Sequence, residues 1–328
     1  MNTIKSFEEG LYGVNASTFP DIALSLFRFQ AEANPVYHDY LSHLRIKPSD
    51  VGALHEIPFL PISFFKSRDI KTGQWLAETI FKSSGTTGQQ TSSHAVKELS
   101  FYLRNSQRIF EQFYGLLFNY HILALLPSYL EREGSSLIAM MKHFIDQSGS
   151  PHSGFYLNNH EVLVEKLQTL RAGTRKILLW GVSFGLLDLA EKFEVDLSGA
   201  VVMETGGMKG RRAEITRQEL HDFLKKRLNV PEIHSEYGMT ELLSQGYAKS
   251  AGLFNFPPWV QPVIRELNDP FCLQREGKAG GINMIDLANF NSCAFVETQD
   301  LGIYTSHGLE ILGRIDNSDV RGCNLLVE

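Results

Sequence analysis

Cysteine is scarce in this chain, and positive charge does not exceed negative charge. The three cysteines, Cys272, Cys293 and Cys323, form no CxxC pair, so we expect neither a disulfide framework nor a cysteine-rich metal site. Each is expected to be a small buried side chain, the usual role of a free cysteine. The net charge of −6 argues against a nucleic-acid partner, because that function needs clustered positive charge.

Long hydrophobic runs are also missing. The longest apolar segments, at residues 122–127 and 177–180, are far too short to cross a bilayer, and residues 1–10 lack the apolar region of a signal peptide. We therefore expect a cytoplasmic protein without a membrane span. With 43% hydrophobic and 21% charged residues among 328, the chain can bury a large core and form one large domain or two smaller ones.

Apolar runs alternate with helical stretches through the middle of the chain. The runs lie at residues 121–126, 176–181, 199–203 and 232–237. This alternation is typical of βαβ units, so we predict an α/β fold around a largely parallel sheet. A capping box at 216–219 indicates the start of the helix that precedes the last run.

The two ends of the chain have a different character. Residues 21–30 place apolar side chains at helical spacing, and Asn34-Pro35 is expected to end that helix. Toward the other end, segments 281–287 and 292–298 are expected to form two strands joined by a short turn. Further short strands are expected near Tyr304 and at 309–312.

A loop rich in glycine and hydroxyl side chains lies at residues 81–92, with the sequence FKSSGTTGQQTS. Glycine lets several backbone N–H groups converge, and hydroxyl groups add donors, so such a loop can wrap a polyphosphate. It is not the P-loop of NTPases, because no lysine follows Gly88. Taken alone, the loop is more simply interpreted as a polar surface turn.

Three further motifs follow that loop. They are SEYGMTE at 235–241, TQDLG at 298–302 and GRIDNSDVRG at 313–322. Together with the loop, and in this order, they resemble the phosphate-loop, YGxTE, TGD and hinge motifs of the adenylate-forming superfamily of acyl-activating enzymes. Four ordered matches are much more specific than one short pattern.

Two more segments narrow the resemblance. With LPSYLER at 126–132 and TGGMKG at 205–210, the chain is most similar to the acyl-protein synthetase family of bacterial bioluminescence, which is related to phenylacetate–CoA ligase-like enzymes. The chain departs from the latter at Thr205-Gly206-Gly207, where those enzymes usually have an Ala-Glu-Pro type turn.

The resemblance implies an α/β fold with the large-domain architecture of the superfamily, in which helices flank mixed sheets. Residues 1–80 would form a helical N-terminal part, 81–280 the core that binds nucleotide and acyl group, and 281–328 a β-rich subdomain that ends at the hinge motif. Most such enzymes continue into a small mobile domain with a catalytic lysine. Because the chain ends soon after Gly322, that domain is expected to be missing.

The resemblance also implies a reaction. A fatty or aryl carboxylic acid would be activated by ATP with Mg²⁺ to an acyl-adenylate, and the acyl group would pass to a thiol of a protein or carrier. An acyl-carrier or reductase protein is the expected partner in that second step. Cys323 is an internal candidate for the acceptor, since a thiolate is a good nucleophile toward acyl groups.

The resemblance assigns roles to the residues at the matching motif positions of this chain. Glu241 would hold Mg²⁺, Thr240 would contact the α-phosphate, Tyr237 would lie near adenine, Asp300 would accept hydrogen bonds from the ribose hydroxyls, and Arg314 would lie near ribose and phosphate. The phosphate loop would contribute Ser83, Ser84, Gly85, Thr86, Thr87 and Gly88. The other nucleotide contacts would be Thr205, Gly206, Gly207, Glu236, Gly238 and Met239.

Thr87, Thr240 and Glu241 are therefore expected to be catalytic, and Lys209 is a further candidate. We hypothesise that Lys209, with Arg211 or Arg212, neutralises phosphate charge during adenylation. The alternative interpretation of Lys209 is a surface lysine.

Two other functions remain open. The sequence GVSFG at 181–185 fits the GxSxG nucleophile elbow of an α/β-hydrolase, with Ser183 as the nucleophile, Asp269 or Asp286 as the acid and His307 as the base. No HGGG-type oxyanion motif accompanies it. The second alternative is a module that binds ATP or an acyl-adenylate without turnover.

Overall fold

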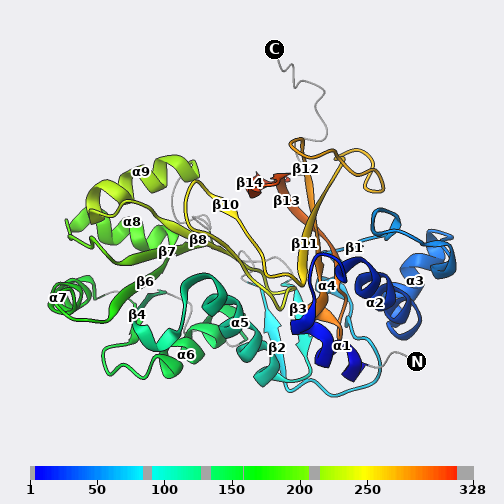
Figure 1. Ribbon diagram of the computed structural model, residues 1–328, viewed down its shortest axis with the longest axis horizontal. Coiled ribbons are helices and arrows are strands. Elements are labelled where there is room, and N and C mark those ends of the chain that lie inside the picture. Colours follow the sequence, from blue (N-terminus) through cyan, green and yellow to red (C-terminus); the bar gives the residue numbers. More distant parts are fainter. Residues whose placement is uncertain (1–3, 84–90, 127–133, 158, 207–214, 316–328) are drawn as a thin grey trace, which may run out of the picture.

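The computed structural model describes residues 4–83, 91–126, 134–157, 159–206 and 215–315. Two six-stranded sheets and one two-stranded hairpin form its framework. Figure 1 shows the hairpin between the two sheets, which lie on opposite sides of the molecule. No helix in these ranges is long and apolar enough to cross a membrane.

The first sheet is formed by the middle of the chain and has the strand order β5-β4-β6-β7-β8-β9. The strands from β5 to β8 are parallel, and only β9 is antiparallel. The parallel sheet predicted from the apolar runs is therefore confirmed. The bounds are β4 Tyr120–Leu125, β5 Gly154–Tyr156, β6 Lys176–Val182, β7 Val201–Thr205, β8 His234–Tyr237 and β9 Gly246–Ala248.

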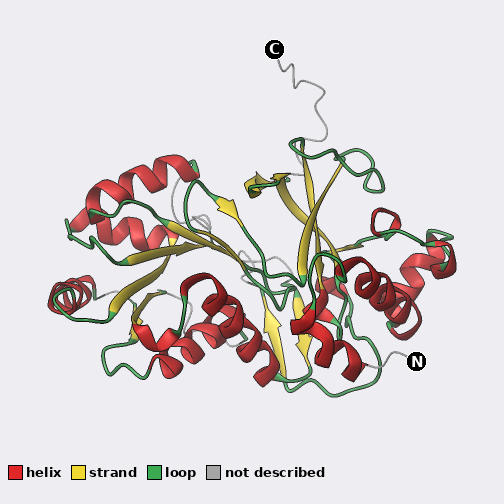
Figure 2. Ribbon diagram, viewed as in Figure 1, coloured by secondary structure: helices red, strands yellow, loops and turns green. Residues whose placement is uncertain are grey.

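Helices cover both faces of this sheet, which explains why the strands are apolar on both sides. Figure 2 shows α8 and α9 above it and α5 and α6 below it. The predicted capping box is confirmed, because the Thr216 hydroxyl accepts a hydrogen bond from the Glu219 N–H and the Glu219 carboxylate accepts one from the Thr216 N–H. The bounds are α5 Leu99–Tyr114, α6 Ser136–Ser148, α7 His160–Leu170, α8 Ser183–Lys192 and α9 Arg217–Leu228.

The second sheet is antiparallel along the order β10-β14-β13-β12-β11, and β1 adds a parallel pairing to β13. One expectation is corrected here. Tyr304 does not lie in a separate short strand, because β13 continues without a break past a register shift at Leu301 and Gly302. The bounds are β1 Leu60–Pro61, β10 Leu253–Phe254, β11 Val260–Arg265, β12 Ala279–Asp286, β13 Phe295–Thr305 and β14 Gly308–Arg314.

The N-terminal helices pack beside the second sheet. The predicted break at Asn34-Pro35 is confirmed: Asn34 caps the next helix by accepting a hydrogen bond from the Tyr37 N–H, and Pro35 begins that helix. The Gln30 side chain fixes the preceding helix to the turn before β13, where it donates to the Asn289 carbonyl and accepts from the Ala294 N–H. The bounds are α1 Ile4–Gly10, α2 Phe19–Ala33, α3 Pro35–His43 and α4 Phe64–Ser67.

The hairpin consists of β2 (Thr79–Lys82) and β3 (Ser93–Val96), which flank the glycine-rich segment. Short 3-10 helices complete the described structure: η1 Leu11–Gly13, η2 Pro48–Asp50, η3 Leu54–Glu56, η4 Leu117–Asn119 and η5 Leu287–Asn289. Among the cysteines, Cys293 is buried as expected, whereas Cys272 is exposed, because it lies in the loop between β11 and β12. Cys323 lies outside the described residues.

Candidate active site

Tyr237 and Asp300 meet across the two sheets. Tyr237 is the last residue of β8, and its hydroxyl donates a 2.8 Å hydrogen bond to Oδ2 of Asp300 on β13. Arg314 lies opposite Asp300 on β14, with its Nε 3.8 Å from Oδ1. Burial raises the pKa of the Asp300 carboxyl, and burial followed by the Asp300 charge raises the pKa of Tyr237. The motifs at 235–241 and 298–302 are thus neighbours in space.

A buried arginine supports the strand that carries Asp300. Arg265 donates from Nη1 to the Ile282 carbonyl and from Nη2 to the Thr298 carbonyl. The Thr298 hydroxyl in turn accepts a hydrogen bond from the Asp300 N–H. Gly281 leaves room for this arginine, because a Cβ there would lie 2.4 Å from the guanidinium and would displace it from these carbonyls.

Glu241 occupies a turn directly after β8, closed by a hydrogen bond from the Leu242 N–H to the Met239 carbonyl. Its exposed fraction is only 5%. Burial raises the pKa of Glu241 and the nearby charge of Asp300 raises it further, whereas a hydrogen bond from the Ser92 hydroxyl lowers it. Both carboxylates are buried, and the charge of Asp300 disfavours ionisation of Glu241, so a cation bound beside Glu241 would stabilise its charged form.

Three buried side chains hold the same turn from outside. His94 of β3 donates from Nδ1 to the Thr240 carbonyl at 2.8 Å, and Asn289 donates from Nδ2 to the Glu241 carbonyl at 2.9 Å. Asp286 accepts hydrogen bonds from the N–H groups of Leu243 and Ser244, each at 3.0 Å. None of these three residues belongs to the motifs that resemble those of acyl-activating enzymes. Their only sequence signal is a polar side chain within or beside an apolar strand.

The end of β7 contributes a second polar group. The Thr205 hydroxyl donates a short hydrogen bond to the carboxylate of Glu236, its register partner on β8. Gly238 leaves room for this carboxylate, since a Cβ there would lie 2.3 Å from Glu236 Oε1 and would displace it. Gly206 follows with a φ of 72°, a conformation that glycine adopts without strain. Met239 packs at the edge of the core.

Several predicted site residues lie outside the described part of the chain: Ser84, Gly85, Thr86, Thr87, Gly88, Gly207, Lys209, Arg211 and Arg212. Of the predicted phosphate loop, Ser83 is described. Its N–H donates to the Ser92 carbonyl and its hydroxyl accepts from the Ser92 N–H. Because Ser92 also bonds Glu241, Ser83 stands close to the turn.

Similarity to known proteins appears at the level of structure. No protein-family model matches the sequence, and no curated protein matches it. A crystal structure of 2-hydroxyisobutyryl-CoA ligase in complex with 2-HIB-AMP and CoA matches with a TM-score of 0.69 over 97% of this chain and 73% of that one, at 13% identity. ATP-bound MatB from Rhodopseudomonas palustris matches with a TM-score of 0.53 over 72% of this chain and 47% of that one, at 15% identity.

The chain has the fold of the adenylate-forming enzymes. The predicted fold class is thereby confirmed. The chain spans about half the length of MatB. At these identities the likeness concerns the fold alone.

The catalytic triad of the alternative hydrolase function is not formed. The hydroxyl of Ser183, at the start of α8, lies 3.0 Å from Glu204 Oε2 and 2.9 Å from the Gly206 carbonyl oxygen and shares its one hydrogen between them, and neither acceptor is a histidine. Asp286 instead binds the turn after Glu241, Asp269 lies exposed in the loop between β11 and β12, and His307 lies in the exposed turn between β13 and β14. The GxSxG pattern has a packing explanation, because Gly181 admits the side chain of Leu186 against β6.

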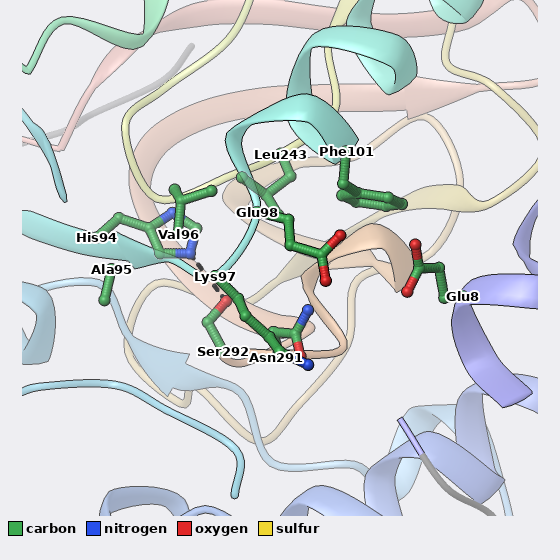
Figure 3. A pocket seen from close by; sticks show the side chains of 10 residues that line it. All are labelled: Glu8, His94, Ala95, Val96, Lys97, Glu98, Phe101, Leu243, Asn291 and Ser292. Atoms are coloured by element: carbon green, nitrogen blue, oxygen red, sulfur yellow. Dashed lines mark hydrogen bonds between the residues drawn. The ribbon is translucent and has the colours of Figure 1, made fainter. Parts of the chain in front are cut away.

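A small hollow lies beside His94 on the opposite side from the Thr240 carbonyl. Figure 3 shows its lining, including Phe101, Leu243 and Ser292, and the hydrogen bond between Ser292 and His94. Its volume of about 10 Å³ admits at most one water molecule. A nucleotide would therefore not bind in this hollow.

His94 gives the protein an expected pH-dependent stability. Burial lowers the pKa of His94 from 6.5 to about 4, so the unfolded chain binds more protons between these values and acid favours unfolding. Between pH 7.5 and pH 5, wild type should lose about 2 kcal/mol more of its free energy of unfolding than His94→Asn, which does not titrate. Urea unfolding of both proteins at the two pH values checks this. Equal losses would contradict a neutral buried His94.

Proposed function

We propose that the protein activates a carboxylic acid with ATP and Mg²⁺ to give an acyl-adenylate and pyrophosphate. The observation that carries this proposal is the meeting of Tyr237 and Glu241, from one motif at the end of β8, with Asp300, from a second motif on β13 of the other sheet. The fold shared with a ligase crystallised with an acyl-AMP ligand supports it. The ordered resemblance of the motifs to those of acyl-activating enzymes supports it independently.

In this proposal Asp300 binds the ribose. Its Oδ2 already accepts the Tyr237 hydroxyl, and its Oδ1 faces the exposed Arg314. A carboxylate oxygen has more than one acceptor site, so Oδ1 can accept a ribose hydroxyl while Tyr237 keeps the group in place. Arg314, 76% exposed at its side chain, would then lie beside the ribose and the phosphates.

Glu241 is proposed to hold Mg²⁺. A hard cation prefers carboxylate, water and phosphate oxygens and often takes only one or two protein carboxylates, which agrees with the absence of a cluster of three or more metal-ligating side chains among the described residues. Bound Mg²⁺ would neutralise charge on the phosphates during attack by the acid. Ser92 orients the Glu241 carboxylate through its hydroxyl.

Side chains and backbone groups of the protein are proposed to balance the phosphate charge that Mg²⁺ does not neutralise. The substrate carboxylate attacks the α-phosphorus, the bond to the bridging oxygen breaks, and pyrophosphate leaves with that electron pair. Thr240 would contact the α-phosphate, while Ser83 and residues 84–88 would bind the β- and γ-phosphates and Lys209 would neutralise charge. Such fixed donors stabilise the developing charge without reorganisation.

For the second step we propose transfer to a thiol of a protein or carrier, as in the acyl-protein synthetases that the motifs at 126–132 and 205–210 resemble. A fatty or aryl acid is the proposed substrate. An acyl-carrier or reductase protein would supply the acceptor, and Cys323 is the internal alternative. Hydroxylamine-sensitive labelling of the protein by a radioactive acid tests the thioester.

With its acid, the protein is expected to convert ATP to AMP and pyrophosphate, with no ADP. A panel of carboxylic acids in ATP–pyrophosphate exchange, followed by chromatography of the nucleotides, measures this. ADP as the sole nucleotide product would refute adenylation. Binding of ATP without exchange for any acid would instead favour the non-catalytic module.

A further inference from the structure

His94 lies in β3 with an exposed fraction of 1%, and both of its ring nitrogens have partners. Nδ1 is 2.8 Å from the Thr240 carbonyl oxygen, and Nε2 is 2.9 Å from the Ser292 hydroxyl. Because a carbonyl oxygen only accepts, Nδ1 carries the hydrogen, and Nε2 accepts one from Ser292. Both nitrogens of the neutral ring are therefore hydrogen-bonded, and these two bonds fix the orientation of the ring.

The carbonyl that His94 holds belongs to the peptide between Thr240 and Glu241. In a planar trans peptide the C=O and the N–H point in opposite directions. The N–H of this peptide lies near the carboxylate of Glu241 itself and lowers the pKa of that group. By fixing the carbonyl, His94 thus fixes the direction of the N–H that orients the Glu241 carboxylate.

The segment that carries His94 contacts Glu241 a second time. Two residues earlier, the Ser92 hydroxyl bonds the same carboxylate. On the other side, Asn289 holds the carbonyl of Glu241. The carboxylate and both flanking carbonyls are therefore bound by side chains from outside the YGMTE motif, and two of these three side chains come from residues 92–94.

We propose that His94 is a positioning residue for Glu241, which it orients through the Thr240–Glu241 peptide without contacting substrate. This inference rests on the proposed function, in which Glu241 holds Mg²⁺. His94 would thereby connect the hairpin of β2 and β3 to the proposed metal-binding turn at Glu241. Side chains that orient a metal ligand typically affect metal affinity or activity by about 10- to 100-fold.

The test uses two variants of His94. His94→Leu removes both hydrogen bonds, whereas His94→Asn keeps an N–H donor near the place of Nδ1. Calorimetry measures the affinity for ATP with Mg²⁺ and with EDTA. His94→Leu should reduce the Mg²⁺-dependent gain in ATP affinity by about 10- to 100-fold and leave the ATP affinity in EDTA unchanged. His94→Asn should retain most of the Mg²⁺-dependent gain.

A matched control and a second measurement separate positioning from general stability. His160, another buried histidine, lies on α7, and His160→Leu should leave the Mg²⁺-dependent gain unchanged. In a ligand-free crystal structure of His94→Leu, the Thr240–Glu241 peptide should be rotated and the contact between Ser92 and Glu241 lost. If His94→Leu does not fold, His94→Gln replaces it in both measurements.

Two results would overturn the proposal. One is a full Mg²⁺-dependent gain in folded His94→Leu, and the other is an unchanged peptide in its crystal structure. If wild type itself shows no Mg²⁺-dependent gain, the proposed function fails. The crystal structure then still decides whether His94 orients Glu241.

Discussion

Glu241→Gln is expected to slow acid-dependent ATP–pyrophosphate exchange by at least about 100-fold, because a metal ion contributes several kcal/mol to transition-state stabilisation. The substitution keeps the size of the side chain and removes the charge that attracts a hard cation. It also removes a buried carboxylate whose pKa is raised by burial. The fold should therefore survive, and urea unfolding would show a midpoint no lower than that of wild type.

The matched control is Glu111→Gln on α5, whose half-buried carboxylate accepts hydrogen bonds from Gln107 and the Leu117 N–H. Its exchange rate should equal that of wild type. Raising the Mg²⁺ concentration should restore part of the activity of Glu241→Gln. A wild-type rate for Glu241→Gln at ordinary Mg²⁺ would remove Glu241 from the metal site.

Asp286→Ala is expected to lower the free energy of unfolding by about 3 kcal/mol or more, because each buried donor left without a partner costs about 1–3 kcal/mol. Asp286 is fully buried and accepts hydrogen bonds from the N–H groups of Leu243, Ser244 and Ala288 and from the Ser244 hydroxyl. Alanine cannot replace any of these contacts. Urea unfolding at pH 7 measures the loss.

Asp222→Ala provides the control, since Asp222 is an exposed residue of α9 that pairs with Gln218 and Lys225. Its effect should stay within about 0.5 kcal/mol, as for most surface substitutions. A loss below about 1 kcal/mol for Asp286→Ala would mean that water or another side chain satisfies these donors.

The sequence could predict the elements that are determined by residues close to one another in the chain. The strand β6 is apolar along nearly its whole length because helices cover both of its faces, and the start of α9 is fixed by a side chain three residues from its partner. The pairing of β1 with β13 has no such local cause. It joins Leu60 to Val296, and nothing in a two-residue strand indicates that partner.

The candidate site shows the same limit. Tyr237, Glu241 and Asp300 could be predicted as site residues, because each belongs to a short contiguous motif. His94 stands in no pattern, and its partner Thr240 is 146 positions away. A polar residue in an apolar strand is consistent with many environments, so only the tertiary structure reveals which backbone group it binds.

The hydrogen bond between Tyr237 and Asp300 affects the order in which the protein should lose activity and structure when it is heated or exposed to denaturant. A displacement of about 1 Å is enough to lose a hydrogen bond, whereas each sheet keeps its own ladder and core through such a shift. The proposed ribose contact of Asp300 depends on the position of one sheet relative to the other. Heat or mild denaturant should therefore inactivate the protein before either sheet melts.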